Sequence, residues 1–131
     1  MKRLIAAACL CLLAVPGLAQ APRDKVELAC EPTKRNLVYR CLVHVADPAG
    51  KPVEGADVML SADMPSMPMM HNVKPVTARP VAGKPGSYEV SLELEMPGEW
   101  MVKLQFRAPR RDLVTRKLDF QKDKVSPART R

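Results

Sequence analysis

Apolar and polar residues alternate with a period of two along most of the chain after residue 25. The stretch "YEVSLELE" is the clearest example, since every second residue is apolar and the others are polar. Its apolar positions are Tyr88, Val90, Leu92 and Leu94. This period is typical of a β-strand with one buried face, whereas a helical face would repeat every 3.6 residues. The pattern therefore predicts a strand over 88–95.

The next stretch, "EWMVKLQF", repeats the alternation, and the two stretches are separated by "MPG". Its inward positions are Trp100, Val102, Leu104 and Phe106. A Pro-Gly pair favours a tight turn, because the glycine can adopt a positive φ. The two stretches therefore predict an antiparallel hairpin.

Further strands are predicted at "VELAC", "LVYRCLVHV", "ADVMLSA", "VKPVTARPV" and "DLVTRKLDF". The fourth is expected at a sheet edge, because Pro75 and Pro80 cannot donate to a ladder. About seven short strands, frequent turn signals and no convincing helix predict an all-β fold, an immunoglobulin-like antiparallel β-sandwich. If successive strands alternate in direction, the loop "MPSMPMMHN", the "MPG" turn and the loop 31–36 meet at one end.

The N-terminus has the features of an export signal. A short basic start precedes the apolar run "LIAAACLCLLAV", which contains Cys9 and Cys11 and is too short to span a bilayer as a helix. We expect cleavage after Ala19 or Ala21 and a periplasmic location; a retained N-terminal anchor is the alternative. The expected organisation is a signal peptide at 1–19, a flexible start at 20–24, one domain at 25–121 and a basic disordered tail at 122–131.

The charge balance does not point to nucleic acid. The formal net charge is +7, but the basic residues are spread along the chain and lack aromatic residues among them. Catalysis is not expected either, because no nucleophile, phosphate-loop or H-E-x-x-H motif occurs and the chain has two histidines.

Two cysteines, Cys30 and Cys41, would remain after export. In an oxidising compartment they are expected to form a disulfide, with free or metal-binding thiols as the alternative. A tight hairpin about "EPTKRN" would place Cys30 opposite Leu37. A bridge therefore requires a longer, asymmetric loop or strands in facing sheets.

The segment "MPSMPMMHN" offers the strongest chemical signal. Thioether sulfur is a soft, neutral ligand that suits Cu(I) and needs no deprotonation. The candidate copper ligands are Met64, Met67, Met69, Met70, His71 and, from the neighbouring turn, Met96. Pro65 and Pro68 would limit the entropy lost when ligands converge.

Methionine is also a common filler of cores and of docking surfaces. The segment could therefore cap the sandwich, or form a metal-free rim that docks a partner. Trp100 could approach copper as a cation–π partner, but its place in the inward series favours a core residue. Glu93 and Glu95 are interpreted as a solvated strand face.

These residues together resemble the FixH/YtkA-like family of exported or membrane-tethered β-sandwich domains. The resemblance covers "DPAGKPVEGADVML", "MPSMPMMHN" and "GSYEVSLELEMPGEWMVKL". It implies copper handling or maturation of haem-copper oxidases, with a periplasmic or membrane-bound copper-handling or oxidase-assembly protein as partner. It also implies that Met64, Met67, Met69 and His71 lie in the family's Met-Pro segment, and that Gly98 and Trp100 are its turn glycine and core tryptophan. FixH itself has a transmembrane anchor beside the domain, so the soluble branch is the closer comparison.

Overall fold

The computed structural model describes Gly17 and residues 20–129. In this part of the chain nine strands form two antiparallel sheets. The strands are β1 (Lys25–Pro32), β2 (Val38–Ala46), β3 (Asp57–Asp63), β4 (Asn72–Thr77), β5 (Arg79–Pro80), β6 (Ser87–Glu93), β7 (Gly98–Ala108), β8 (Asp112–Phe120) and β9 (Val125–Pro127).

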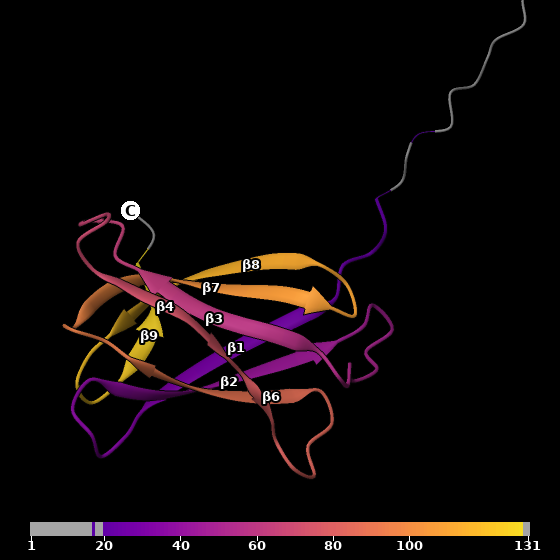
Figure 1. Cartoon of the computed structure of the whole chain (residues 1–131), viewed down its shortest axis with the longest axis horizontal. Coiled ribbons are helices and arrows are strands. Elements are labelled where there is room, and N and C mark those ends of the chain that lie inside the picture. The colour runs from indigo at the N-terminus through magenta and orange to yellow at the C-terminus, as the bar shows by residue number, and fades with distance from the viewer. Residues whose placement is uncertain (1–16, 18–19, 130–131) are drawn as a thin grey trace, which may run out of the picture.

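The sheets pack face to face as a sandwich (Figure 1). One has the order β1-β2-β6-β5 and the other β4-β3-β7-β8-β9. These orders follow the immunoglobulin pattern. β1, β2 and β6 correspond to strands A, B and E of one immunoglobulin sheet, and β3, β7 and β8 correspond to strands C, F and G of the other. The predicted fold is confirmed, but the described residues form nine strands where about seven were expected.

The core follows the period-two pattern. Every inward position predicted on β6 and β7 is buried, and Trp100, Val102 and Leu104 are fully excluded from solvent. On β2 the same is true of Tyr39, Cys41 and the two valines that follow at this spacing. Leu37, predicted as part of that series, instead lies in the preceding turn with a φ of 56°. Alternation identified the core because each strand of the two sheets has one inner and one outer face.

One predicted strand, "VKPVTARPV", is divided between the two sheets. Its first part, β4, pairs with β3, and its second part, β5, pairs with β6. The chain passes between the sheets at Ala78, which is buried and donates its backbone N–H to Val58 O at 2.9 Å. Both halves are edge strands, as the prolines predict.

Both ends of the domain are longer than expected. The predicted disordered tail contains β9, which pairs with β8 through Val125, Ser126 and Pro127 and completes the ladder of that sheet. The predicted flexible start is held against the β7–β8 turn, because Arg23 pairs with Asp112 and Arg110 with Asp24. The Arg23 guanidinium holds the pKa of the Asp112 carboxyl below its ordinary value, chiefly through their hydrogen bond.

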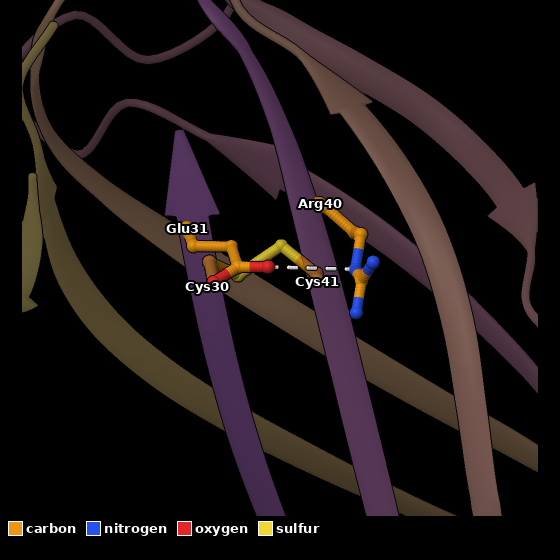
Figure 2. Close-up of a disulfide and its surroundings, with 4 residues drawn as sticks. All are labelled: Cys30, Glu31, Arg40 and Cys41. Atoms are coloured by element: carbon orange, nitrogen blue, oxygen red, sulfur yellow. Dashed lines mark ion pairs between the residues drawn. A yellow bond between two sulfur atoms is a disulfide. The ribbon is translucent and has the colours of Figure 1, made fainter. Parts of the chain in front are cut away.

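Cys30 and Cys41 form a disulfide between the neighbouring strands β1 and β2 (Figure 2). Neither expected route applies, because the strands are neighbours in one sheet and the loop between them spans only residues 33–37. The turn is instead centred later in the chain than one about "EPTKRN", so Cys30 is directly opposite Cys41 and their Cα atoms are 4.0 Å apart. The bridge lies on the core face. On the outer face Glu31 and Arg40, the next pair in register, form an ion pair of 3.5 Å.

The predicted signal peptide, including Cys9 and Cys11, lies outside the described residues apart from Gly17. Within the described part of the chain, no helix has the length and hydrophobicity needed to cross a membrane.

Candidate metal centre

Two segments far apart in the sequence meet at one end of the sandwich, at the left of Figure 1. They are the loop 64–71 between β3 and β4 and the turn 94–98 between β6 and β7, which together we call the methionine rim. Met64 Cε lies only 2.9 Å from the position that a Cβ on Gly98 would occupy. Because β3 and β7 are antiparallel, the end of one strand adjoins the start of the other, as strand parity predicts.

The loop 64–71 is built from two successive proline turns. Met67 N–H donates to Met64 O at 3.1 Å, and Met70 N–H donates to Met67 O at 3.3 Å. Pro65 and Pro68 occupy the second position of these turns, where a fixed φ is favourable. Met64 N–H donates to His71 O at 3.2 Å and closes the loop at its base.

Met69 has a φ of 72°. It occupies the third position of its turn, which with Pro68 before it matches a type II turn that normally carries glycine or asparagine. A residue with a Cβ pays a conformational cost of about 1 kcal/mol or more there. The turn thus carries a thioether at a position where glycine would avoid this conformational cost.

The structure separates the candidate ligands by exposure. Met64 is buried in the core, and Met67 and Met96 are partly buried against it. Met69 and Met70 are 92% and 74% exposed. Met64, Met67 and Met96 therefore cap the core of the sandwich, as one of the two interpretations expected. Met69 and Met70 project into solvent.

His71 lies between these groups and contacts the neighbouring turn. Its Nδ1 is 2.5 Å from Glu95 Oε2, so one carboxylate joins the loop 64–71 to the turn 94–98. When Nδ1 is engaged in this way, Nε2 is the nitrogen that remains for another ligand. A carboxylate bound to the outer nitrogen of a histidine is a common arrangement behind metal ligands.

The turn 94–98 is fixed from below by the core. Trp100 is fully buried, and its Nε1 donates to Met96 O at 3.2 Å. The indole is therefore a core residue that supports Met96 through its backbone, and its burial excludes direct contact with an ion at the surface of the rim in this conformation.

A tyrosine ties another loop to the same end. Tyr39 donates its hydroxyl to Gln121 O at 2.9 Å, and its ring meets that of Phe120 edge-on at 4.8 Å. Burial, with a smaller contribution from Asp119, raises the pKa of Tyr39. The β8–β9 turn is thereby anchored next to β2.

Hard donors are not gathered into a metal site in the described residues, because no three side chains among His, Cys, Asp and Glu are grouped together. The two thiols at 30 and 41 are consumed by the disulfide. A metal centre in this part of the chain would therefore depend on thioethers, with His71 as the only nearby imidazole. His44 lies elsewhere, exposed on β2 and 3.1 Å from Ser87 Oγ.

Sequence reasoning missed Glu95, which was interpreted as a solvated face residue. β6 ends at Glu93, so Glu95 belongs to the turn and reaches across to His71. Its position directly before Met96, in a turn predicted to lie at the same end as His71, was the signal available. Met59 and Met101 are partly buried on β3 and β7, outside the rim.

A family model described as YtkA-like matches residues 19–105. The chain belongs to the YtkA-like family. The match begins before β1 and ends within β7, so it includes the whole methionine rim and the disulfide. No curated protein and no solved structure gives a significant match. Membership of the YtkA-like family thus rests on the sandwich and on the segment that carries the rim.

Proposed function

We propose that this YtkA-like chain is an exported, periplasmic copper-binding protein that holds copper, mainly as Cu(I), at the methionine rim. It would buffer or deliver the ion in copper homeostasis or in the maturation of haem-copper oxidases. The resemblance of the Met-Pro segment to that of the FixH/YtkA-like domains motivates this role.

The exposure of Met69 and Met70 carries the proposal. Large apolar side chains are normally withdrawn from water, yet these two are 92% and 74% exposed. One of them also occupies a backbone conformation that disfavours any residue with a Cβ. An exposed pair of soft donors beside a histidine is what capture of a soft ion from solution requires.

The residues of the rim fit copper better than other common metals. Thioethers and imidazole bind Cu(I), and imidazole also accepts Cu(II), whereas Ca(II) and Mg(II) prefer oxygen ligands. Met67, Met70 and Met96 would supply sulfur around the ion and His71 would supply Nε2. Met69 points into solvent, where it could exchange the ion with another carrier, and Met64 lies deepest, against Gly98.

The test is a titration of the protein starting at Gln20 with Cu(I) against a colorimetric competitor. We expect stoichiometric competition by the parent and its loss in the variant Met67→Leu/Met70→Leu/His71→Gln. Leucine removes the sulfur while keeping the apolar volume nearly constant. The matched control is Met59→Leu/Met101→Leu, which removes two thioethers outside the rim and should bind as the parent does.

The same exposed methionines suit a metal-free interaction module that docks a periplasmic partner, since a flexible, polarizable surface adapts to many shapes. Two results separate the functions. No competition for Cu(I) by the folded parent would refute the copper proposal. Partner binding that persists in a copper chelator and is lost in Met69→Ser/Met70→Ser would favour the interaction module.

A further inference from the structure

The methionines of the rim differ in how far a reagent dissolved in water can reach them. Met64, Met67 and Met96 lie in the core or pack against it, whereas Met69 and Met70 are exposed and form no part of it. No other methionine of the described residues is exposed. The outer pair, Met69 and Met70, is therefore where such a reagent first meets a thioether.

The loop 64–71 keeps its conformation without the side chains of the outer pair. Its two turns and its base are closed by backbone hydrogen bonds, and Pro65 and Pro68 fix φ within the turns. The side chains of Met69 and Met70 take part in none of these bonds and pack against no core residue. A chemical change at either sulfur therefore leaves the loop and the sandwich their stabilising contacts.

The reaction open to an exposed thioether is oxygen transfer from a peroxide. A sulfur lone pair attacks one peroxide oxygen, an S=O bond forms and the O–O bond breaks. The second oxygen leaves as water once solvent has delivered a proton to it, so the sulfur loses the two electrons that the peroxide gains. Met69 and Met70 have the solvent contact that this proton transfer requires, and the buried Met64 does not.

Oxidation of an inner methionine would damage the fold instead. Met64 is buried, and its Cε lies 2.9 Å from the position of a Cβ on Gly98. A sulfoxide at Met64 would bury a strongly polar oxygen in an apolar cluster, which costs free energy unless a hydrogen-bond donor reaches it. The arrangement thus exposes the two sulfurs whose oxidation the fold tolerates and shields the one whose oxidation it does not.

We propose that Met69 and Met70 form a reversible oxidation site, which a peroxide converts to sulfoxides and a thiol-dependent sulfoxide reductase restores. In the reverse step two thiols of the reductase supply the electrons, the sulfoxide oxygen leaves as water and a disulfide forms in the reductase. A reductase must enclose the oxidised side chain. Met69 and Met70 allow this, because they lie on a loop that extends beyond the strands at the left of Figure 1.

Oxidation of the outer pair would also close the proposed copper site, a consequence that rests on the proposed function. A sulfoxide no longer offers the soft thioether donor that Cu(I) prefers, and its oxygen is a hard ligand. Met70 would leave the set of ligands, and Met69 would no longer exchange the ion with another carrier. The outer pair would thus lower Cu(I) binding in the presence of peroxide while the sandwich stays folded.

The first test treats the protein starting at Gln20, which contains every described strand, with hydrogen peroxide. Mass spectrometry of proteolytic fragments follows each methionine. We expect Met69 and Met70 to be oxidised at least about tenfold faster than Met64, Met67 and Met96, without a change in far-UV circular dichroism. Reductases specific for the two sulfoxide epimers, supplied with a dithiol, should return the original mass.

Three results of this test would overturn the oxidation site. They are similar rates at the exposed and the core methionines, loss of the fold when only the outer pair is oxidised, and sulfoxides that both reductases leave unchanged in the folded protein.

The second test compares Cu(I) competition by the reduced and the oxidised protein. We expect oxidation to weaken Cu(I) binding by about tenfold or more, and the reductases to restore it. The control Met59→Leu/Met101→Leu should lose and regain Cu(I) in the same way. Met69→Gln/Met70→Gln replaces both thioethers by polar side chains, so it should bind Cu(I) weakly before oxidation and change little after it.

The two tests separate failure of this inference from failure of the proposed function. Equal competition by the reduced and the oxidised parent would refute the closing of the copper site. A reduced parent that does not compete for Cu(I) would refute the proposed function. The rates at single methionines and their reversal would still decide whether Met69 and Met70 are an oxidation site.

Discussion

His71 and Glu95 face one another across the methionine rim, with Nδ1 of the imidazole 2.5 Å from Oε2 of the carboxylate. The contact joins two loops that are separated by β4, β5 and β6 in the chain. It orients the imidazole, selects which ring nitrogen remains free, and holds Met96 beside the loop 64–71. Glu95 is thus a positioning residue for the proposed copper site.

Glu95→Gln should weaken Cu(II) binding by about 10- to 100-fold, because a carboxylate behind a histidine ligand raises its basicity and fixes its orientation. Cu(I) binding should weaken less, since thioethers carry most of it. Competition titrations with both ions measure the difference. Glu93→Gln, which alters an exposed carboxylate on β6 without a contact to His71, is the matched control. Equal losses in the two variants would contradict the role of Glu95.

Gly98→Ala should destabilise the fold by about 1–3 kcal/mol. Gly98 has a φ of 133°, and a Cβ there would lie 2.9 Å from Met64 Cε. The methionine would have to move away from the turn, which should also disturb the rim. Urea unfolding followed by far-UV circular dichroism gives the free energy.

Gly50→Ala separates the cost of the positive φ from the cost of the steric contact with Met64. Gly50 also has a positive φ, 88°, but no atom lies within 4 Å of the position of its added Cβ. It should therefore show the backbone cost without the steric one. If both variants lose the same stability, the contact with Met64 has no energetic weight.

Cys30→Ala/Cys41→Ala should lower the free energy of unfolding by about 2–3 kcal/mol in a chain-entropy account of a short closed loop. The bridge joins positions 11 residues apart and fixes the edge strand β1 to β2. Urea unfolding of the parent with and without reductant should give a similar difference, which distinguishes the crosslink from the lost packing of Cys41. A variant as stable as the oxidised parent would show that the bridge does not stabilise the fold.

Tyr39→Phe should alter the alkaline limb of the stability curve. The ordinary pKa of tyrosine is 10.0, and burial raises it for Tyr39. The neutral phenol contributes its full stability below the unfolded pKa, and this contribution is lost as the pH rises through the folded pKa. Stability should therefore fall more steeply above pH 10.0 in the parent than in the variant.

At neutral pH the variant should be less stable by about 1 kcal/mol, the net value of the hydrogen bond to Gln121. Thermal unfolding at several pH values between neutral and strongly alkaline gives both comparisons. Since Tyr39 is the only residue that differs between the two proteins, the difference between the curves isolates its contribution. Parallel curves would contradict the effect of burial.

The sequence predicted those features that depend on strand faces. The alternation in "YEVSLELE" and "EWMVKLQF" identified the buried residues, because each strand has one inner face. Strand direction then placed the "MPG" turn beside the loop 64–71, since direction alternates in an antiparallel sheet whatever the register.

Features that depend on strand register, or on which of the two sheets a strand joins, were harder to predict from the sequence. The change of sheet at Ala78 has no signature, because an alanine in an edge strand and an alanine between sheets look alike in sequence. The position of Cys30 opposite Cys41 depends on where the β1–β2 turn is centred, and this turn contains Leu37 at a positive φ that few leucines adopt. β9 was missed since three residues are too short to show alternation.

The hydrogen bond from Trp100 Nε1 to Met96 O links the only tryptophan in the chain to the base of the rim. The indole is fully buried, so its fluorescence comes from a single dry environment. Any event that displaces the Met96 carbonyl, whether an ion, a partner or an oxidised thioether, acts on that one emitter. Trp100 is therefore an intrinsic fluorescent probe of the proposed binding site. The intensity of its emission can report conformational changes at the methionine rim without an added dye.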